Sequence, residues 1–111
     1  MIARRPVGKP FAGLWELPGG KLEVGEDARA ALDRELAEEV GIEVLEAHAW
    51  MHLSHDYGDR VIDLSCWQVT HFAGEARPLE GQSLRWISPD QVRQYRFPPA
   101  NAALIEAIER L

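Results

Sequence analysis

The sequence GKLEVGEDARAALDRELAEEVGI, residues 20–42, decides the fold of this chain. Its apolar residues recur at about 100° per residue, the spacing of one stripe of an amphipathic helix. That stripe consists of Ala28, Ala31, Leu32, Leu36 and Val40. Gly41 follows at the position of a C-terminal glycine cap. The pattern therefore predicts a helix that ends at Gly41 and a strand that begins near Ile42.

Three glutamates of this helix, Glu35, Glu38 and Glu39, lie in or beside the apolar stripe. Like charges one helical turn apart destabilise a helix by roughly 0.2–0.5 kcal/mol per pair. Partial burial of carboxylates adds to that cost unless a cation compensates. Clustered carboxylates are hard oxygen ligands that suit Mg²⁺ or Mn²⁺, and Mg²⁺ usually shares its coordination with substrate phosphates. The pattern therefore predicts a divalent metal site that acts on a phosphate substrate.

The competing interpretation of this helix is a solvated acidic face, whose glutamates pair with Arg29 and Arg34. A solvated face does not require turns at fixed distances from the glutamates. Such turns are nevertheless present, at Pro18-Gly19-Gly20, at Gly25-Glu26 and at Gly41. We therefore favour the catalytic interpretation.

A short apolar run before the helix ends at Pro18-Gly19-Gly20, where glycines let the main chain approach a ligand closely. The carbonyl of Gly19 is therefore a candidate metal ligand. Lys21 places a positive charge beside the expected phosphate site, and its role stays open between a phosphate contact and a solvated side chain.

The spacing of residues 20–42 resembles the Nudix box, the signature of metal-dependent hydrolases that cleave nucleoside diphosphates linked to another group. Every fixed position of the Nudix box is occupied by the expected residue in this sequence. Residues 14–21 and 97–101 are similar to the MutT branch, which hydrolyses oxidised purine nucleotides such as 8-oxo-dGTP to the monophosphate. The resemblance covers the whole chain. It implies an α/β/α sandwich with a mixed central sheet, and a Mg²⁺ cofactor that Mn²⁺ could replace.

The resemblance also implies roles for the acidic residues. Arg34 would orient the carboxylate cluster through charge-assisted hydrogen bonds. Either Glu35 or Glu80 would be the catalytic base, and the sequence does not choose between them. The implied metal ligands are Gly19, Glu35, Glu38, Glu39 and Glu80.

The substrate contacts also follow from the resemblance. Asn101 would hydrogen-bond the base edge, because an amide offers one acceptor and two donors. Without the resemblance, Asn101 is an ordinary residue at a helix start. Arg5 and Arg60 would approach the nucleotide. The remaining implied contacts are Glu16, Leu17, Pro18, Gly19 and Lys21.

The rest of the chain predicts strands and a closing helix. Residues 50–57 and 60–72 form an expected hairpin around the turn at Gly58-Asp59. A short strand at 84–87 precedes a helix start at Ser88-Pro89-Asp90. Residues 101–111 carry one apolar helical face. Helices that alternate with strands in this way predict an α/β fold.

Length and charge limit the function further. The 111 residues predict a single domain, residues 1–111. A net charge of −6 argues against a nucleic acid polymer as partner, although a free nucleotide remains compatible. The single cysteine, Cys66, predicts a buried structural residue in a reducing cytoplasm. The sequence has no apolar run near the roughly 18 residues of a membrane span, so we expect no membrane partner.

The sequence starts with Met1 and the segment Ile2-Ala3-Arg4-Arg5. In MutT-like chains another strand comes before this segment. We therefore expect a Nudix fold that lacks this first strand, roughly 5–10 residues plus a turn. A start assigned too late is the favoured explanation, and loss of activity or a partner strand at the open edge are the alternatives. The expected assembly is accordingly a monomer, or a dimer through that sheet edge.

Two other functions stay open. The first is a Nudix pyrophosphatase for a cytidine nucleotide, a dinucleoside polyphosphate or a nucleotide sugar, because the box fixes the cleavage and not the base. The second is a catalytically silent nucleotide-binding module. The intact carboxylates Glu35, Glu38 and Glu39 argue against the silent module.

Overall fold

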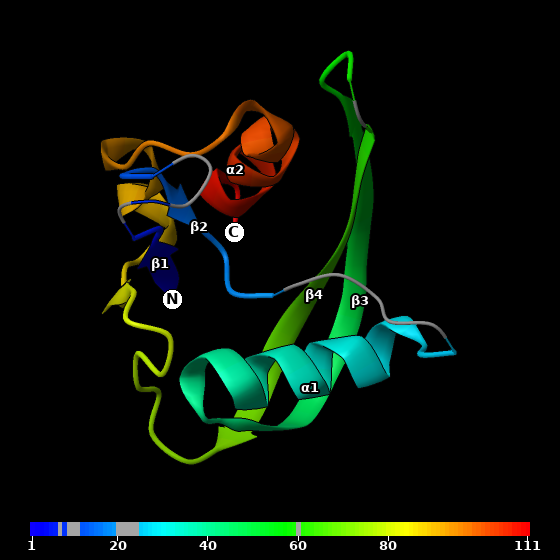
Figure 1. Ribbon diagram of the computed structural model, residues 1–111, viewed down its shortest axis with the longest axis vertical. Helices are drawn as coiled ribbons and strands as arrows, with labels where there is room; N and C mark the ends of the chain where they lie inside the picture. The colour runs from blue at the N-terminus through cyan, green and yellow to red at the C-terminus, as the bar shows by residue number, and fades with distance from the viewer. Residues whose placement is uncertain (7, 9–11, 20–24, 60) are drawn as a thin grey trace.

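The computed structural model describes residues 1–6, 8, 12–19, 25–59 and 61–111. Along these residues two strands precede the first helix, three strands follow it, and short helices close the chain (Figure 1). The elements are β1 (Ile2–Arg4), β2 (Trp15–Glu16), α1 (Ala28–Val40), β3 (Glu43–Asp56), β4 (Val61–Ala73), β5 (Ser83–Arg85), the 3₁₀ helices η1 (Pro89–Gln94) and η2 (Pro99–Asn101), and α2 (Ala102–Glu109).

The long hairpin β3–β4 dominates the structure (Figure 1). Its antiparallel register runs from Glu43↔Ala73 to Asp56↔Val61, with irregularities that include one between Ala49 and Met51. The turn is tightened by a hydrogen bond from Gly58 N to Asp56 Oδ1 at 2.7 Å. The expected hairpin is confirmed. Its first strand is longer than expected, because the apolar segment after Gly41 belongs to the same strand as residues 50–57.

A second sheet has the strand order β2-β1-β5. Strand β1 lies in its centre and pairs antiparallel with both neighbours, through Ala3↔Glu16 on one side and Ala3↔Leu84 on the other. The α/β class is confirmed. In the part of the chain that the structure describes, the strand pairs of the expected mixed sheet are divided between two sheets, and each of these pairs is antiparallel.

Helix α1 begins and ends where its sequence provides caps. Asp27 Oδ1 accepts a hydrogen bond from Ala30 N at 2.7 Å, which satisfies a free donor of the first turn. Gly41 adopts φ 72° and donates its N–H to Ala37 O at 3.1 Å. A Cβ at Gly41 would lie 3.2 Å from Leu79 Cδ1, so both the backbone conformation and the space favour glycine.

The main core forms where α1 meets both sheets. The buried residues Leu36, Val40, Ile42 and Val44 form one cluster, and Val40 is completely buried. Partly buried residues from both sheets and from neighbouring segments pack against it: Met1, Leu32, Ala47, Val69, Ala76 and Leu84. The core cluster thus joins α1 to the hairpin and to the second sheet.

The C-terminal elements follow the expected order. Ser88 precedes η1, and Gln91 Oε1 accepts from Ser88 N at 3.0 Å as one half of a capping box. The predicted closing helix is α2, which buries Leu104 and Ile105. Within the described residues, no helix combines the length and the apolar character needed to cross a membrane.

Candidate active site

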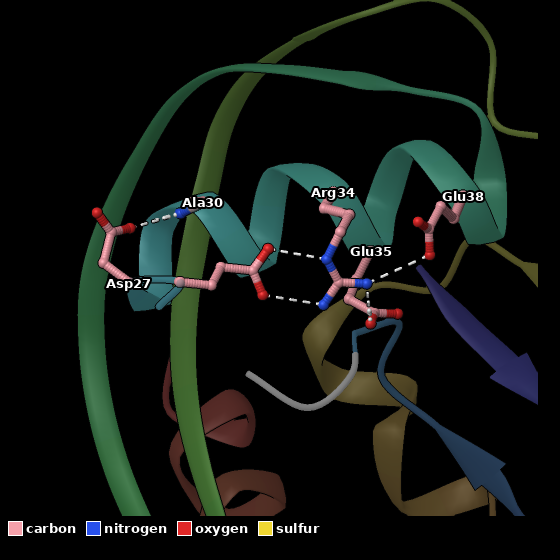
Figure 2. A network of polar contacts seen from close by, with 6 residues as sticks. Asp27, Ala30, Arg34, Glu35 and Glu38 are labelled. Carbon is pink, nitrogen blue, oxygen red and sulfur yellow. Dashed lines mark hydrogen bonds and ion pairs between the residues drawn. The ribbon is translucent and has the colours of Figure 1, made fainter. Parts of the chain in front are cut away.

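Arg34 is the centre of a polar network on α1 (Figure 2). Its guanidinium binds Glu26 through two nearly parallel contacts, Nε to Oε2 at 2.8 Å and Nη2 to Oε1 at 3.0 Å. Nη1 donates to Glu35 Oε1 at 2.7 Å and to Glu38 Oε2 at 3.3 Å. Bidentate, charge-assisted contacts of this kind fix the orientation of the carboxylate as well as its distance from the guanidinium. Arg34 therefore orients three carboxylates at once.

The carboxylates of α1 differ in their exposure. The Glu35 side chain is 16% exposed, whereas that of Glu38 is 58% exposed. The helix therefore turns Glu35 toward the protein and leaves Glu38 in solvent. The salt bridge of Arg34 with Glu26 is also shielded, because the Glu26 side chain is only 14% exposed.

Glu39 lies on the inner side of α1. Its Oε2 accepts a hydrogen bond from Gly19 N at 2.9 Å, which fastens the end of the Pro18-Gly19 segment to the helix. The pKa of Glu39 is raised to about 7, chiefly by burial and in addition by the charges of Glu35, Glu80 and Glu16, against the lowering effect of the Gly19 N–H. The carboxylates of four residues, Glu16, Glu35, Glu39 and Glu80, thus share one region of negative potential.

The loop that carries Glu80 is attached to the last turn of α1. Leu79 N donates to Glu39 O at 3.1 Å, and Arg77 N donates to Val40 O at 2.9 Å. Gln82 connects the same two segments, because its Nε2 donates to Glu39 O at 3.0 Å and its Oε1 accepts from Glu80 N at 2.9 Å. Glu80 is exposed, on a loop whose backbone is tied to the carboxylate helix.

Two expected substrate contacts, Arg5 and Glu16, form an ion pair with each other. Both side chains are about one-third exposed, and the pairing of β1 with β2 brings them together. Leu17 and Pro18 follow β2, are half-buried, and lead to Gly19 beside Glu39. The loop before α1 therefore connects the Arg5–Glu16 pair to the carboxylates.

Asn101 lies at the start of α2 with φ −93° and ψ 0°, and its side chain does not cap that helix. Its N–H donates to Pro98 O at 3.0 Å. The preceding residue, Ala100, donates its N–H to Tyr57 Oη at 3.0 Å. The structure therefore brings the tip of the hairpin to the turn that presents Asn101.

Two expected substrate contacts, Lys21 and Arg60, lie outside the described residues, as does Gly20 of the turn. Their roles stay predictions. Sequence reasoning did not single out Gln82, Tyr57 or the capping residue Asp27. It used Glu26 only as part of the spacing and did not identify it as the partner of Arg34.

The donor set fits a hard divalent cation. Its atoms are carboxylate oxygens, and the pKa of Glu39 is raised first by burial and then by the negative charges of its neighbours. The described residues do not form a ready cluster of three or more Asp, Glu, His or Cys side chains in metal-holding geometry. Glu35 is instead bound by Arg34, and Glu39 by Gly19 N. Nudix hydrolases in general use divalent metals such as Mg²⁺.

This fold and site define an α/β protein whose carboxylates, gathered on one helix, suit metal-assisted phosphate chemistry. The sequence model of the NUDIX domain matches residues 1–107, and the chain belongs to the Nudix family. It is a hydrolase that acts on nucleotides.

Relatives and solved structures agree with this assignment. The chain is 40% identical to the CTP pyrophosphohydrolase of Escherichia coli K12, over all of this chain and 82% of the relative. It is 39% identical to the 8-oxo-dGTP diphosphatase of the same organism, over 99% of this chain and 85% of the relative. A solved structure from a study of MutT from Aliivibrio salmonicida and Vibrio cholerae superposes with TM-score 0.85 and 38% identity, over 96% of this chain and 82% of that one.

Proposed function

We propose that this protein hydrolyses oxidised purine nucleoside triphosphates, such as 8-oxo-dGTP, to the monophosphate and pyrophosphate, with Mg²⁺ or Mn²⁺ as cofactor. The observation that carries the proposal is the group of carboxylates around Glu39, which raise its pKa together with burial. Such a site attracts a divalent cation and, through it, a polyphosphate.

The metal would be held by Glu35, Glu38, Glu39, Glu80 and the carbonyl of Gly19. When bound, it supplies charge neutralisation for the phosphates and a water of lowered pKa. Arg34 keeps the Glu35 carboxylate in place through the 2.7 Å contact to Oε1. Either Glu35 or Glu80 takes the proton of the attacking water.

On the substrate side, the Asn101 amide reads the base edge. Its side chain is not used to cap α2, which leaves it available for that role. We propose that Arg5, Arg60 and Lys21 contact the nucleotide. The segment Glu16, Leu17, Pro18 and Gly19 forms the adjoining wall, since Gly19 N already lies 2.9 Å from the Glu39 carboxylate.

A cytidine triphosphate is the second candidate substrate. The relative that is named a CTP pyrophosphohydrolase is 40% identical over the whole of this chain. The carboxylate site does not discriminate between the two substrates, because it would interact only with their phosphates. The two candidates differ at the base, and therefore at Asn101.

A nucleotide panel with Mg²⁺ tests the proposal. Pyrophosphate release is measured for 8-oxo-dGTP, dGTP, CTP and dCTP, and release of mononucleotides for a dinucleoside polyphosphate, with a chelator as the metal-free control. We expect 8-oxo-dGTP to exceed the others in kcat/KM by roughly tenfold or more, as is typical of hydrogen-bonded base recognition. A higher kcat/KM for CTP would select the second candidate. Absence of hydrolysis for the whole panel would contradict the proposal.

We also propose that residues 1–111 act as one domain in the cytoplasm, as a monomer or as a dimer through a sheet edge, without a nucleic acid polymer as partner. The net charge of −6 supports the last point. Cys66 is half-buried, and burial raises the pKa of its thiol, which supports a structural role. Light scattering of the purified protein measures the assembly state.

A further inference from the structure

The far end of the hairpin touches the C-terminal part of the chain at one well-defined contact. Tyr57 Oη accepts a hydrogen bond from Ala100 N at 3.0 Å, between residues that are 43 positions apart in the sequence. Strand β3 and η2 lie against each other there. In Figure 1 the hairpin rises from α1 toward the level of α2, so this contact lies well away from the base of the hairpin.

The turn before Asn101 has few donors of its own. Pro98 and Pro99 carry no backbone N–H, so Ala100 provides the first main-chain donor after Phe97. The next donor, Asn101 N, binds Pro98 O inside the turn. The Ala100 N–H is therefore a main-chain donor of this turn that binds outside the turn, and its acceptor is the Tyr57 hydroxyl.

Tyr57 is itself held firmly. It follows the 14-residue strand β3, whose register with β4 extends to Asp56↔Val61. The His55 ring packs edge-on against the Tyr57 ring, with 4.5 Å between centroids. The turn beyond it is closed by the Gly58 N to Asp56 Oδ1 bond. The hydroxyl is thus a fixed point supplied by the hairpin.

We propose that Tyr57 is a positioning residue that determines base specificity: its hydroxyl fixes the turn at Ala100 so that the adjacent Asn101 amide meets a purine base in one orientation. The inference rests on the proposed function. An amide discriminates between bases only when its oxygen and nitrogen are held in place, since rotation would exchange donor and acceptor. A base edge with a carbonyl beside a protonated ring nitrogen requires such fixed pairing.

The test separates base recognition from hydrolysis. Binding of 8-oxo-dGMP and dGMP is measured by calorimetry for the native protein, for Tyr57→Phe and for Tyr95→Phe. Tyr95 is the matched control, because its hydroxyl also accepts one hydrogen bond, from Arg85 Nη1 at 3.1 Å, outside the proposed base site. We expect Tyr57→Phe to reduce the 8-oxo-dGMP preference roughly three- to tenfold, the size of one lost hydrogen bond. Tyr95→Phe should keep the native ratio.

Two further measurements connect the effect to Asn101. Amide exchange followed by NMR should show faster exchange of the Ala100 N–H in Tyr57→Phe. The double variant Tyr57→Phe/Asn101→Ala should lose no more discrimination than Asn101→Ala alone, because Tyr57 acts through Asn101. In turnover with 8-oxo-dGTP, KM should rise in Tyr57→Phe while kcat changes by less than about twofold.

The outcomes are distinguishable. A native protein that binds 8-oxo-dGMP more tightly than dGMP but hydrolyses no triphosphate contradicts the proposed function. The ratio of the two affinities in Tyr57→Phe then still supports or refutes the role of Tyr57. An unchanged binding ratio in Tyr57→Phe, or additive losses in the double variant, overturns the inference. So does a native protein without any preference between the two monophosphates.

Discussion

The carboxylate helix α1 and the turn at Asn101 both present candidate site residues, yet they are held in different ways. The contacts of Arg34 on α1 reach residues one, four and eight positions away. The turn at Asn101 is held by Tyr57, 43 positions from Ala100. The carboxylates that contact Arg34 are thus oriented within one local segment, to which Gly19 and the Glu80 loop are attached, whereas base recognition depends on how distant segments meet. Substitutions in the first region should therefore affect turnover, and those in the second should affect selectivity.

The largest effect is expected for Glu35→Gln. The amide keeps the shape of the side chain but loses the negative charge and the basic oxygen, so kcat should fall by roughly 10²–10⁴-fold with a smaller change in substrate binding. Pyrophosphate release at saturating substrate measures kcat. Glu106→Gln is the control, since Glu106 pairs with Arg110 on the exposed face of α2. Native turnover in Glu35→Gln would refute its catalytic role.

Arg34→Lys should have the next largest effect. Lysine keeps the positive charge but lacks the planar guanidinium that binds Glu26 through two nitrogens and Glu35 through a third, so we expect kcat to fall roughly tenfold and the free energy of unfolding by about 1–3 kcal/mol. Turnover assays and urea denaturation measure the two quantities. Arg29→Lys is the matched control, because among the described residues Arg29 forms a single ion pair, with Asp33 at 3.0 Å. Equal effects of the two substitutions would show that Arg34 contributes charge alone.

Gln82→Met tests whether a distant contact can also matter at the carboxylate end. The substitution removes the two hydrogen bonds that join Glu80 N and Glu39 O, so the Glu80 loop should loosen and kcat should fall several-fold, with a loss of roughly 1–3 kcal/mol in stability. Gln91→Met removes one similar bond, to Ser88 N, at a remote site and should leave kcat at the native value. A native kcat in Gln82→Met would show that the loop is held by its backbone bonds.

The last prediction concerns the pH dependence of stability and not turnover. The pKa of Glu39 is raised from 4.5 to about 7 in the folded protein, so the folded state binds more protons than the unfolded state between these values. Stability of the metal-free protein should therefore decrease as pH rises from about 4.5 to 7 and then level off. Thermal denaturation measures it, at roughly 4–8 °C in Tm per kcal/mol. In Glu39→Gln this decrease should be absent. An equal decrease in both proteins would assign it to other groups.

The two regions also differ in how well the sequence predicted them. The helix, its end at Gly41 and the inward direction of Glu35 follow from spacing alone, because their causes lie within a few residues. The contacts of Gln82 and Tyr57 do not follow from the sequence. Gln82 lies in a loop and Tyr57 follows a strand, and the residues beside them form no pattern from which a partner 43 positions away can be predicted. The length of β3 was underestimated, since the irregularity between Ala49 and Met51 interrupts its alternation.

The core cluster to which α1 contributes Leu36 and Val40 is packed by residues of both sheets, Leu84 of β5 and Ala47 and Val69 of the hairpin. The helix that carries the carboxylates is therefore also part of the main core. Substitutions in this helix are therefore constrained both by the proposed chemistry of its carboxylates and by the packing of its apolar residues. Variants with altered substrates should accordingly arise through changes in the hairpin tip and the C-terminal turn.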